Sequence, residues 1–94
     1  MTKILLAGLA FLSAPALASS HYHAQPAGPA EARVVAKDVL WKCGDAGCAA
    51  GKSNSRPDVI CASLARQVGK LSRFSVAGTE FTADQLEKCN ARAG

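Results

Sequence analysis

The chain has 94 residues, four cysteines, five aromatic side chains, and eleven lysines and arginines against seven acidic residues, for a formal net charge of +4. This length predicts one small domain. The cations are dispersed and few aromatic side chains accompany them, so nucleic-acid binding is not expected, whereas a mild basic excess suits loose attraction to anionic polymers.

Residues 1–18, MTKILLAGLAFLSAPALA, predict a secretory signal peptide. An early lysine precedes an apolar run, and the small–x–small sequence Ala16-Leu17-Ala18 follows, as in a cleavage site. The apolar run is shorter than the roughly 20 residues that a membrane span needs. We therefore expect cleavage between Ala18 and Ser19, export to the periplasm or the extracellular space, and no membrane span in the mature chain.

Residues 19–32, SSHYHAQPAGPAEA, are small and polar and lack an apolar period, which favours a flexible lead-in. With cleavage as predicted, the mature chain begins Ser19-Ser20-His21. An amine, two amide nitrogens and an imidazole in one plane suit Cu(II) or Ni(II), and His23 could add a contact. Copper binding at the amino terminus is therefore an alternative function. The plainer interpretation is that the two histidines simply lie in a flexible linker.

Residues 33–94 are the expected folded domain. The segment RVVAKDVLWKC, residues 33–43, is rich in β-branched and large apolar side chains and predicts one strand. Residues 44–47, Gly-Asp-Ala-Gly, have the composition of a turn, and a short returning strand or loop is expected from Cys48.

A helix is expected next, with Ser55 as its capping residue and Pro57 in its first turn, where the missing N–H is not needed. Apolar side chains follow at helical intervals up to Val68, and Gly69 is a natural stop.

The last part of the chain predicts a hairpin and a second helix. KLSRFSVAGTEF alternates and turns at Ala77-Gly78. Thr82 and Gln85 have the spacing of a capping box, so the final helix should begin there and continue through Cys89. The order hairpin, helix, hairpin, helix describes a small α+β domain.

Four cysteines in a small exported chain predict disulfides, since a zinc site would normally show paired Cys-x2-Cys knuckles. Three pairings are possible. We predict Cys43 with Cys48, which flank a four-residue turn, and Cys61 with Cys89, which join the two helices on their core sides.

The sequence lacks the residue patterns that nucleotide binding or catalysis would need. AGCAAGKS, residues 46–53, satisfies the loose form of a phosphate-binding loop, but the expected helix starts several residues too late, so nucleotide binding is not expected. Both histidines lie in the predicted lead-in, and the acidic residues show no pairing. We therefore assign no catalytic residue and do not expect an enzyme.

The segments LWKCGDAGC, SRPDVICASLARQVGKL, FSVAG and LEKCN, which span roughly residues 39–90, resemble a group of short exported alphaproteobacterial proteins without an assigned function. The four cysteines, Trp41 and the Arg56-Pro57 pair carry this resemblance. It implies export and a disulfide-stapled domain, and it brings no activity. The sequence thus predicts a non-enzymatic binding or structural module of the cell envelope, with an envelope protein or an anionic envelope polymer as its partner.

Overall fold

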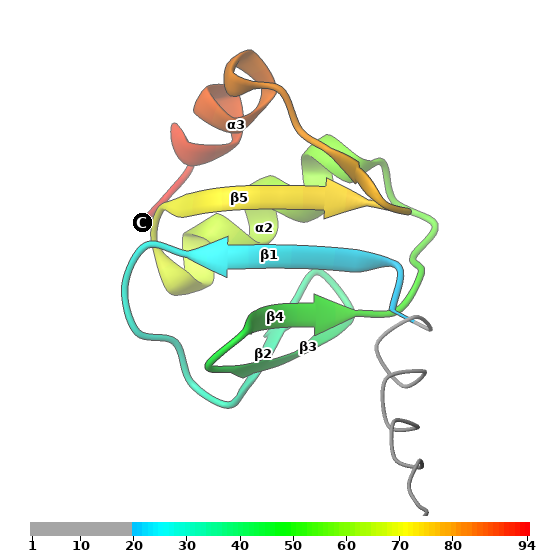
Figure 1. The fold of residues 1–94 in the computed structure, drawn as a ribbon, viewed down its shortest axis with the longest axis vertical. Helices are drawn as coiled ribbons and strands as arrows, with labels where there is room; N and C mark the ends of the chain where they lie inside the picture. The colour runs from blue at the N-terminus through cyan, green and yellow to red at the C-terminus, as the bar shows by residue number, and fades with distance from the viewer. Residues whose placement is uncertain (1–19) are drawn as a thin grey trace, which may run out of the picture.

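The computed structural model describes residues 20–94, so the predicted signal peptide lies outside the described residues. The described chain forms a six-stranded antiparallel sheet with two helices, which confirms the α+β class (Figure 1). Within this part, neither helix is long and apolar enough to cross a membrane. In chain order the elements are β1 (Tyr22–Pro26), β2 (Arg33–Ala36), β3 (Val39–Gly44), β4 (Gly47–Ala50), α2 (Pro57–Val68), β5 (Leu71–Val76), β6 (Thr79–Glu80) and α3 (Ala83–Asn90).

The strands lie in the order β2-β3-β4-β1-β5-β6, which places β1 in the middle of the sheet. Tyr22 and Ala24 point into the core and are 2% and 5% exposed. The prediction of a flexible lead-in over residues 19–32 is therefore wrong for residues 22–26, and the folded domain begins near residue 22 instead of residue 33. The strand is short and includes Ala24 and Pro26, which are unfavourable in strands, so its stability comes from pairing with β4 and β5 and not from local propensity.

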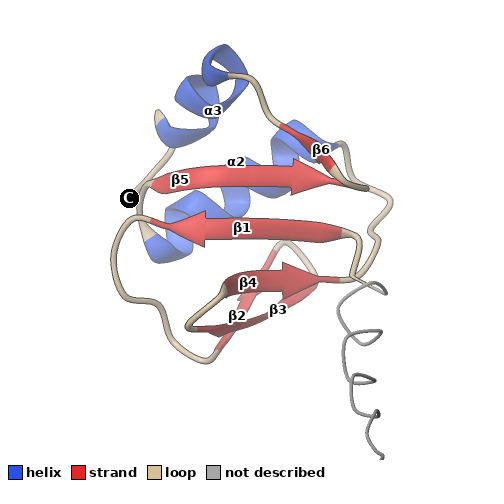
Figure 2. Ribbon diagram, viewed as in Figure 1, coloured by secondary structure: helices blue, strands red, loops and turns tan. Residues whose placement is uncertain are grey.

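The helices pack on one side of the sheet, with α2 behind β1 and β5, and α3 against α2 and β5 (Figure 2). The rings of Tyr22, Trp41 and Phe74 lie with their centroids 6.1 Å apart in each pair. These rings meet Ile60 and Leu64 of α2, which are fully buried. Trp41 is thus a core residue, and its indole N–H has no hydrogen-bond acceptor among the described residues.

Residues 33–43 are two strands and not the single strand that their composition predicts. Ala36 pairs with Val39, so a two-residue turn of Lys37 and Asp38 separates β2 from β3. Both turn residues have positive φ, 51° and 63°, as in a type I′ turn. Such turns favour Asn-Gly, and this sequence has neither residue there, so the turn carried no recognisable signal.

We expect the double change Lys37→Asn/Asp38→Gly to raise the free energy of unfolding by about 1 kcal/mol, because it relieves two side chains held in the left-handed region. Chemical denaturation measures this change. Lys37→Ala is the control, since alanine keeps the strained Cβ without the local hydrogen bonds of asparagine, and it should bring no gain. An Asn-Gly variant no more stable than Lys37→Ala would contradict this assignment of the turn.

The helix boundaries follow the local signals closely. Helix α2 begins with Pro57, but its N-cap residue is Arg56, which makes no side-chain capping bond, so the prediction of Ser55 as the cap is wrong by one residue. Gly69 ends α2 with a φ of 90°. The capping box of α3 is present as predicted, with Thr82 Oγ1 accepting from Gln85 N at 3.2 Å and Gln85 Oε1 accepting from Thr82 N at 2.8 Å.

Two disulfides join Cys43 to Cys48 and Cys61 to Cys89, the pairing that the sequence predicts. The first connects directly paired residues of β3 and β4, whose Cα atoms are 4.0 Å apart, shorter than the wide antiparallel spacing of about 5.5 Å. The second joins α2 to α3 with a Cα separation of 5.8 Å, and both of its cysteines are buried. The second disulfide therefore fixes how the two helices lie against each other.

Candidate functional site

A groove of about 820 Å³ runs along α2 and α3. One side of the groove is formed by a single face of α2 and its N-cap. The residues on this face are seven and three positions apart and are Arg56, Ser63 and Arg66. Lys88 and Arg92 line the groove from α3 and the turn that follows. The two helices thus turn cationic side chains toward a shared hollow.

The positive charge of the domain is concentrated in this groove. Ten of the eleven lysines and arginines lie in residues 20–94 together with all seven acidic residues. Five of these cations and one acid line the groove, which leaves five cations and six acids for the rest of the described chain. Outside the groove the described domain is therefore close to neutral, and the basic excess belongs to one surface. The five cations are Lys37, Arg56, Arg66, Lys88 and Arg92, and the acid is Asp58.

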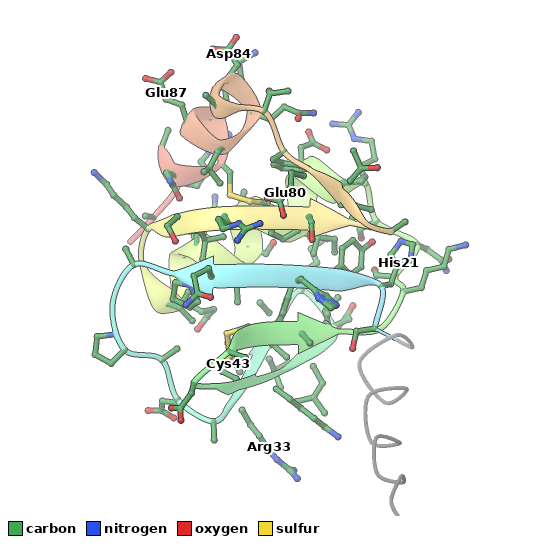
Figure 3. All side chains as sticks on the ribbon, viewed as in Figure 1. His21, Arg33, Cys43, Glu80, Asp84 and Glu87 are labelled. Atoms are coloured by element: carbon green, nitrogen blue, oxygen red, sulfur yellow. A yellow bond between two sulfur atoms is a disulfide. The ribbon has the colours of Figure 1, made fainter. Side chains whose placement is uncertain are left out.

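Asp58 offsets only part of this charge. Its carboxylate lies 3.2 Å from the Arg56 guanidinium, and both side chains are well exposed to solvent, so the pair is weak. The two acids of α3, Asp84 and Glu87, point outward from the helix, away from the sheet, and do not line the groove (Figure 3). An anion in the groove would therefore meet four cations that no acid lining the groove neutralises.

The floor of the groove is apolar and fixed. Val59, Ala62 and Cys89 contribute to it, together with Phe81, whose ring lies 4.7 Å from that of Phe74 between centroids. Besides the disulfide of Cys89, the end of α3 is held by Asn90. Its amide nitrogen donates to Leu71 O and its amide oxygen accepts from Leu71 N, both at 2.8 Å. The walls of the groove are therefore set before any ligand arrives.

Sequence reasoning missed this groove because the cations are far apart along the chain. A partial signal existed, since Arg56 and Arg66 share one helical face and Lys88 and Arg92 another. The disulfide of Cys61 with Cys89 joins the two helices that carry these faces, so the predicted pairing could have been used to bring the faces together.

The exposed face of the sheet carries a second group of polar residues. Cross-strand pairing places His23 beside Ser75, and Ser75 beside Glu80. Within the described chain no hydrogen bond joins His23 to Ser75, and Glu80 is engaged by Arg73 at 2.9 Å. A hydrolytic triad needs the histidine between the serine and the acid, whereas here the serine lies between them. This row therefore does not have triad geometry.

The predicted copper ligands His21 and His23 lie at the start of the sheet. The amide nitrogen of His21 donates to Ala50 O at 2.9 Å, and its carbonyl accepts from Ala77 N at 2.8 Å. A planar Cu(II) site at the amino terminus needs that same amide nitrogen deprotonated and bound to the metal. Copper would therefore have to displace the hydrogen bond that joins the start of β1 to the end of β4. Among residues 20–94, no three His, Cys, Asp or Glu side chains are placed to hold a metal ion together.

The glycine-lysine-serine run does not have the arrangement of a phosphate-binding loop. Residues 47–50 form β4, residues 51–56 form a loop, and α2 begins only at Pro57, four residues after Ser53. Ser53 instead holds the loop through a bond from Ser55 N to its hydroxyl oxygen at 3.2 Å.

Comparisons with known proteins give a family for the chain but no activity. A family model described as a family of unknown function, DUF8200, matches residues 5–91. No curated protein and no solved structure matches the chain. The matched residues include the complete sheet, both helices, both disulfides and nearly the whole groove, of whose lining residues only Arg92 lies beyond the match. The chain therefore belongs to DUF8200, a family of unknown function.

Proposed function

We propose that this domain is a non-enzymatic module that binds an anionic partner in the groove between α2 and α3. The observation that carries the proposal is the concentration of charge, five cations and one acid in a groove on an otherwise nearly neutral domain. Cations gathered along a concave surface focus the electrostatic potential and raise the local concentration of anions.

The side chains suit carboxylate or phosphate groups. Arg56, Arg66 and Arg92 carry planar guanidinium groups that can donate two parallel hydrogen bonds to either anion. The apolar floor allows the non-ionic part of a ligand to pack beneath its charges. The fixed walls limit the ordering that binding requires, which favours affinity.

The proposed compartment is the periplasm or the extracellular space. Two supports exist: the signal peptide that residues 1–18 predict, and two disulfides without a free cysteine, which persist in oxidising environments and are rare in the cytosol. Anionic polymers of the cell envelope are accessible there, and they are the partner class that we favour over an envelope protein.

Removing two groove cations tests the proposal. In Arg66→Gln/Lys88→Gln, we expect the affinity for inorganic triphosphate at low salt to fall about tenfold, since two charged contacts are lost. Isothermal titration calorimetry on the purified mature protein measures the dissociation constant. Raising the salt concentration should weaken binding to the unaltered protein, because the contacts are exposed.

The matched control is Arg33→Gln/Lys42→Gln, which removes one arginine and one lysine from paired positions of β2 and β3 outside the groove. This variant should bind triphosphate within about twofold of the unaltered protein, since it changes the net charge but not the groove. Equal losses in the two double variants would show that the domain attracts anions only through its net charge, and would refute the proposed site.

A further inference from the structure

A second hollow adjoins the groove at the same end of α2. It has a volume of about 490 Å³ and lies between the β2–β3 turn and the loop of residues 51–55. Lys37 lines both hollows, and Ser55 of the second is followed directly by Arg56 of the groove. The two hollows therefore meet at Lys37 and at the start of α2.

The cations continue across this junction. Lys52 lines the second hollow together with Lys37, and Asp38 is the acid that lines it. At the other end, Arg56 and Arg66 are ten residues apart on α2, which corresponds to about 15 Å along the helix. A single small anion cannot contact cations that are so widely separated, whereas a chain of anionic groups can.

The conformation of Lys37 supports a role at the junction. Its φ of 51° is a value at which a long side chain is disfavoured and where asparagine or glycine would be more stable. Non-glycine residues in this region persist where surrounding structure enforces them, and they cluster at binding sites. Here the strained turn places a lysine where the two hollows meet.

We infer that the ligand is a linear polyanion that runs along the groove, across Lys37 and into the second hollow beside Lys52. This inference rests on the proposed function and specifies its ligand class. Phe81 is the one aromatic side chain that lines the groove, and no aromatic side chain lines the second hollow, so the described surface lacks the row of stacking platforms that successive bases would need. The repeating unit is therefore a carboxylate or a phosphate on a chain without nucleobases.

The test compares short and long chains of each anion: triphosphate with long-chain polyphosphate, and trigalacturonate with a long oligogalacturonate. The variant is Lys52→Gln, which alters only the second hollow, and its matched control is Lys42→Gln, an exposed lysine of β3 that lines neither hollow. Dissociation constants are measured by calorimetry on the mature protein at one fixed low salt concentration.

We expect at least one long chain to bind more tightly than its short counterpart, and Lys52→Gln to weaken that long chain about threefold while leaving the short one within about twofold. Lys42→Gln should leave the dissociation constants of both the long and the short chain within about twofold of those of the unaltered protein. The arm that shows the length effect identifies phosphate or carboxylate as the repeating group.

Two results would overturn the inference and are distinguishable. If the short anion binds in the groove but the long chain gains nothing, or if Lys52→Gln and Lys42→Gln act alike on the long chain, the linear ligand is refuted and the proposed function stands. If neither short nor long anions bind, the proposed function fails together with the inference.

Discussion

The change Tyr22→Ala is expected to destabilise the domain by about 3–5 kcal/mol, the usual cost of removing a buried aromatic ring. Tyr22 lies on the central strand, is 2% exposed, and its ring contacts those of Trp41 and Phe74 in the middle of the core. A domain of this size has a total stability of only about 5 kcal/mol, so the variant should be largely unfolded at room temperature. Circular dichroism during urea denaturation measures the loss.

His23→Ala is the matched control for this change. His23 directly follows Tyr22 in the same strand and therefore belongs to the opposite face of the sheet, where it pairs with Ala49 and Ser75. Its removal should cost less than about 1 kcal/mol, as is usual for substitutions outside the core. If Tyr22→Ala were as stable as His23→Ala, residues 22–26 would not form the central strand.

Replacing both Cys61 and Cys89 by alanine is expected to cost about 3–4 kcal/mol, the second-largest effect. This disulfide closes a loop of 28 residues, and cross-linking restricts the unfolded chain more strongly as the loop grows. Its loss also removes the covalent link between α2 and α3, so the two cationic walls of the groove are held less firmly. Denaturant unfolding of the double variant measures the stability, and triphosphate titration measures the binding.

The double change Cys43→Ala/Cys48→Ala supplies the comparison. That disulfide has a sequence separation of 5 and joins residues that the β3–β4 hairpin already pairs, so its loss should cost clearly less stability. It also lies outside the groove, and triphosphate binding should remain. If this variant were the less stable of the two, the helix-to-helix disulfide would not be the main constraint on the fold.

Elements with strong local signals were predictable from the sequence. The capping box of Thr82 and Gln85, the turn at Ala77-Gly78 and the stop at Gly69 each involve a few neighbouring residues whose chemistry dictates one conformation. The disulfide pairing was also accessible, because each pair follows from one local element or from two helices that share a core.

Elements whose stability comes from distant partners were not predictable in the same way. The strand of residues 22–26 is held by β4 and β5, which pair with it from far along the chain, and its own alternation covers only four residues before Pro26, too few to predict a strand. The turn of Lys37 and Asp38 lacks the residues that its backbone favours. The groove has the same origin, since its cations come from two helices and a turn that only the folded chain assembles.

Mapping an anion onto the folded domain by nuclear magnetic resonance tests the central claim most directly. The isotopically labelled mature protein is titrated with triphosphate while the backbone amide signals are followed. We predict that the shifts concentrate at groove positions such as Ser63, Arg66 and Lys88, while Lys42 and His23 on the exposed face of the sheet stay unchanged. Shifts spread evenly over the surface, or centred on the exposed face of the sheet, would contradict the assignment of the groove as the binding site.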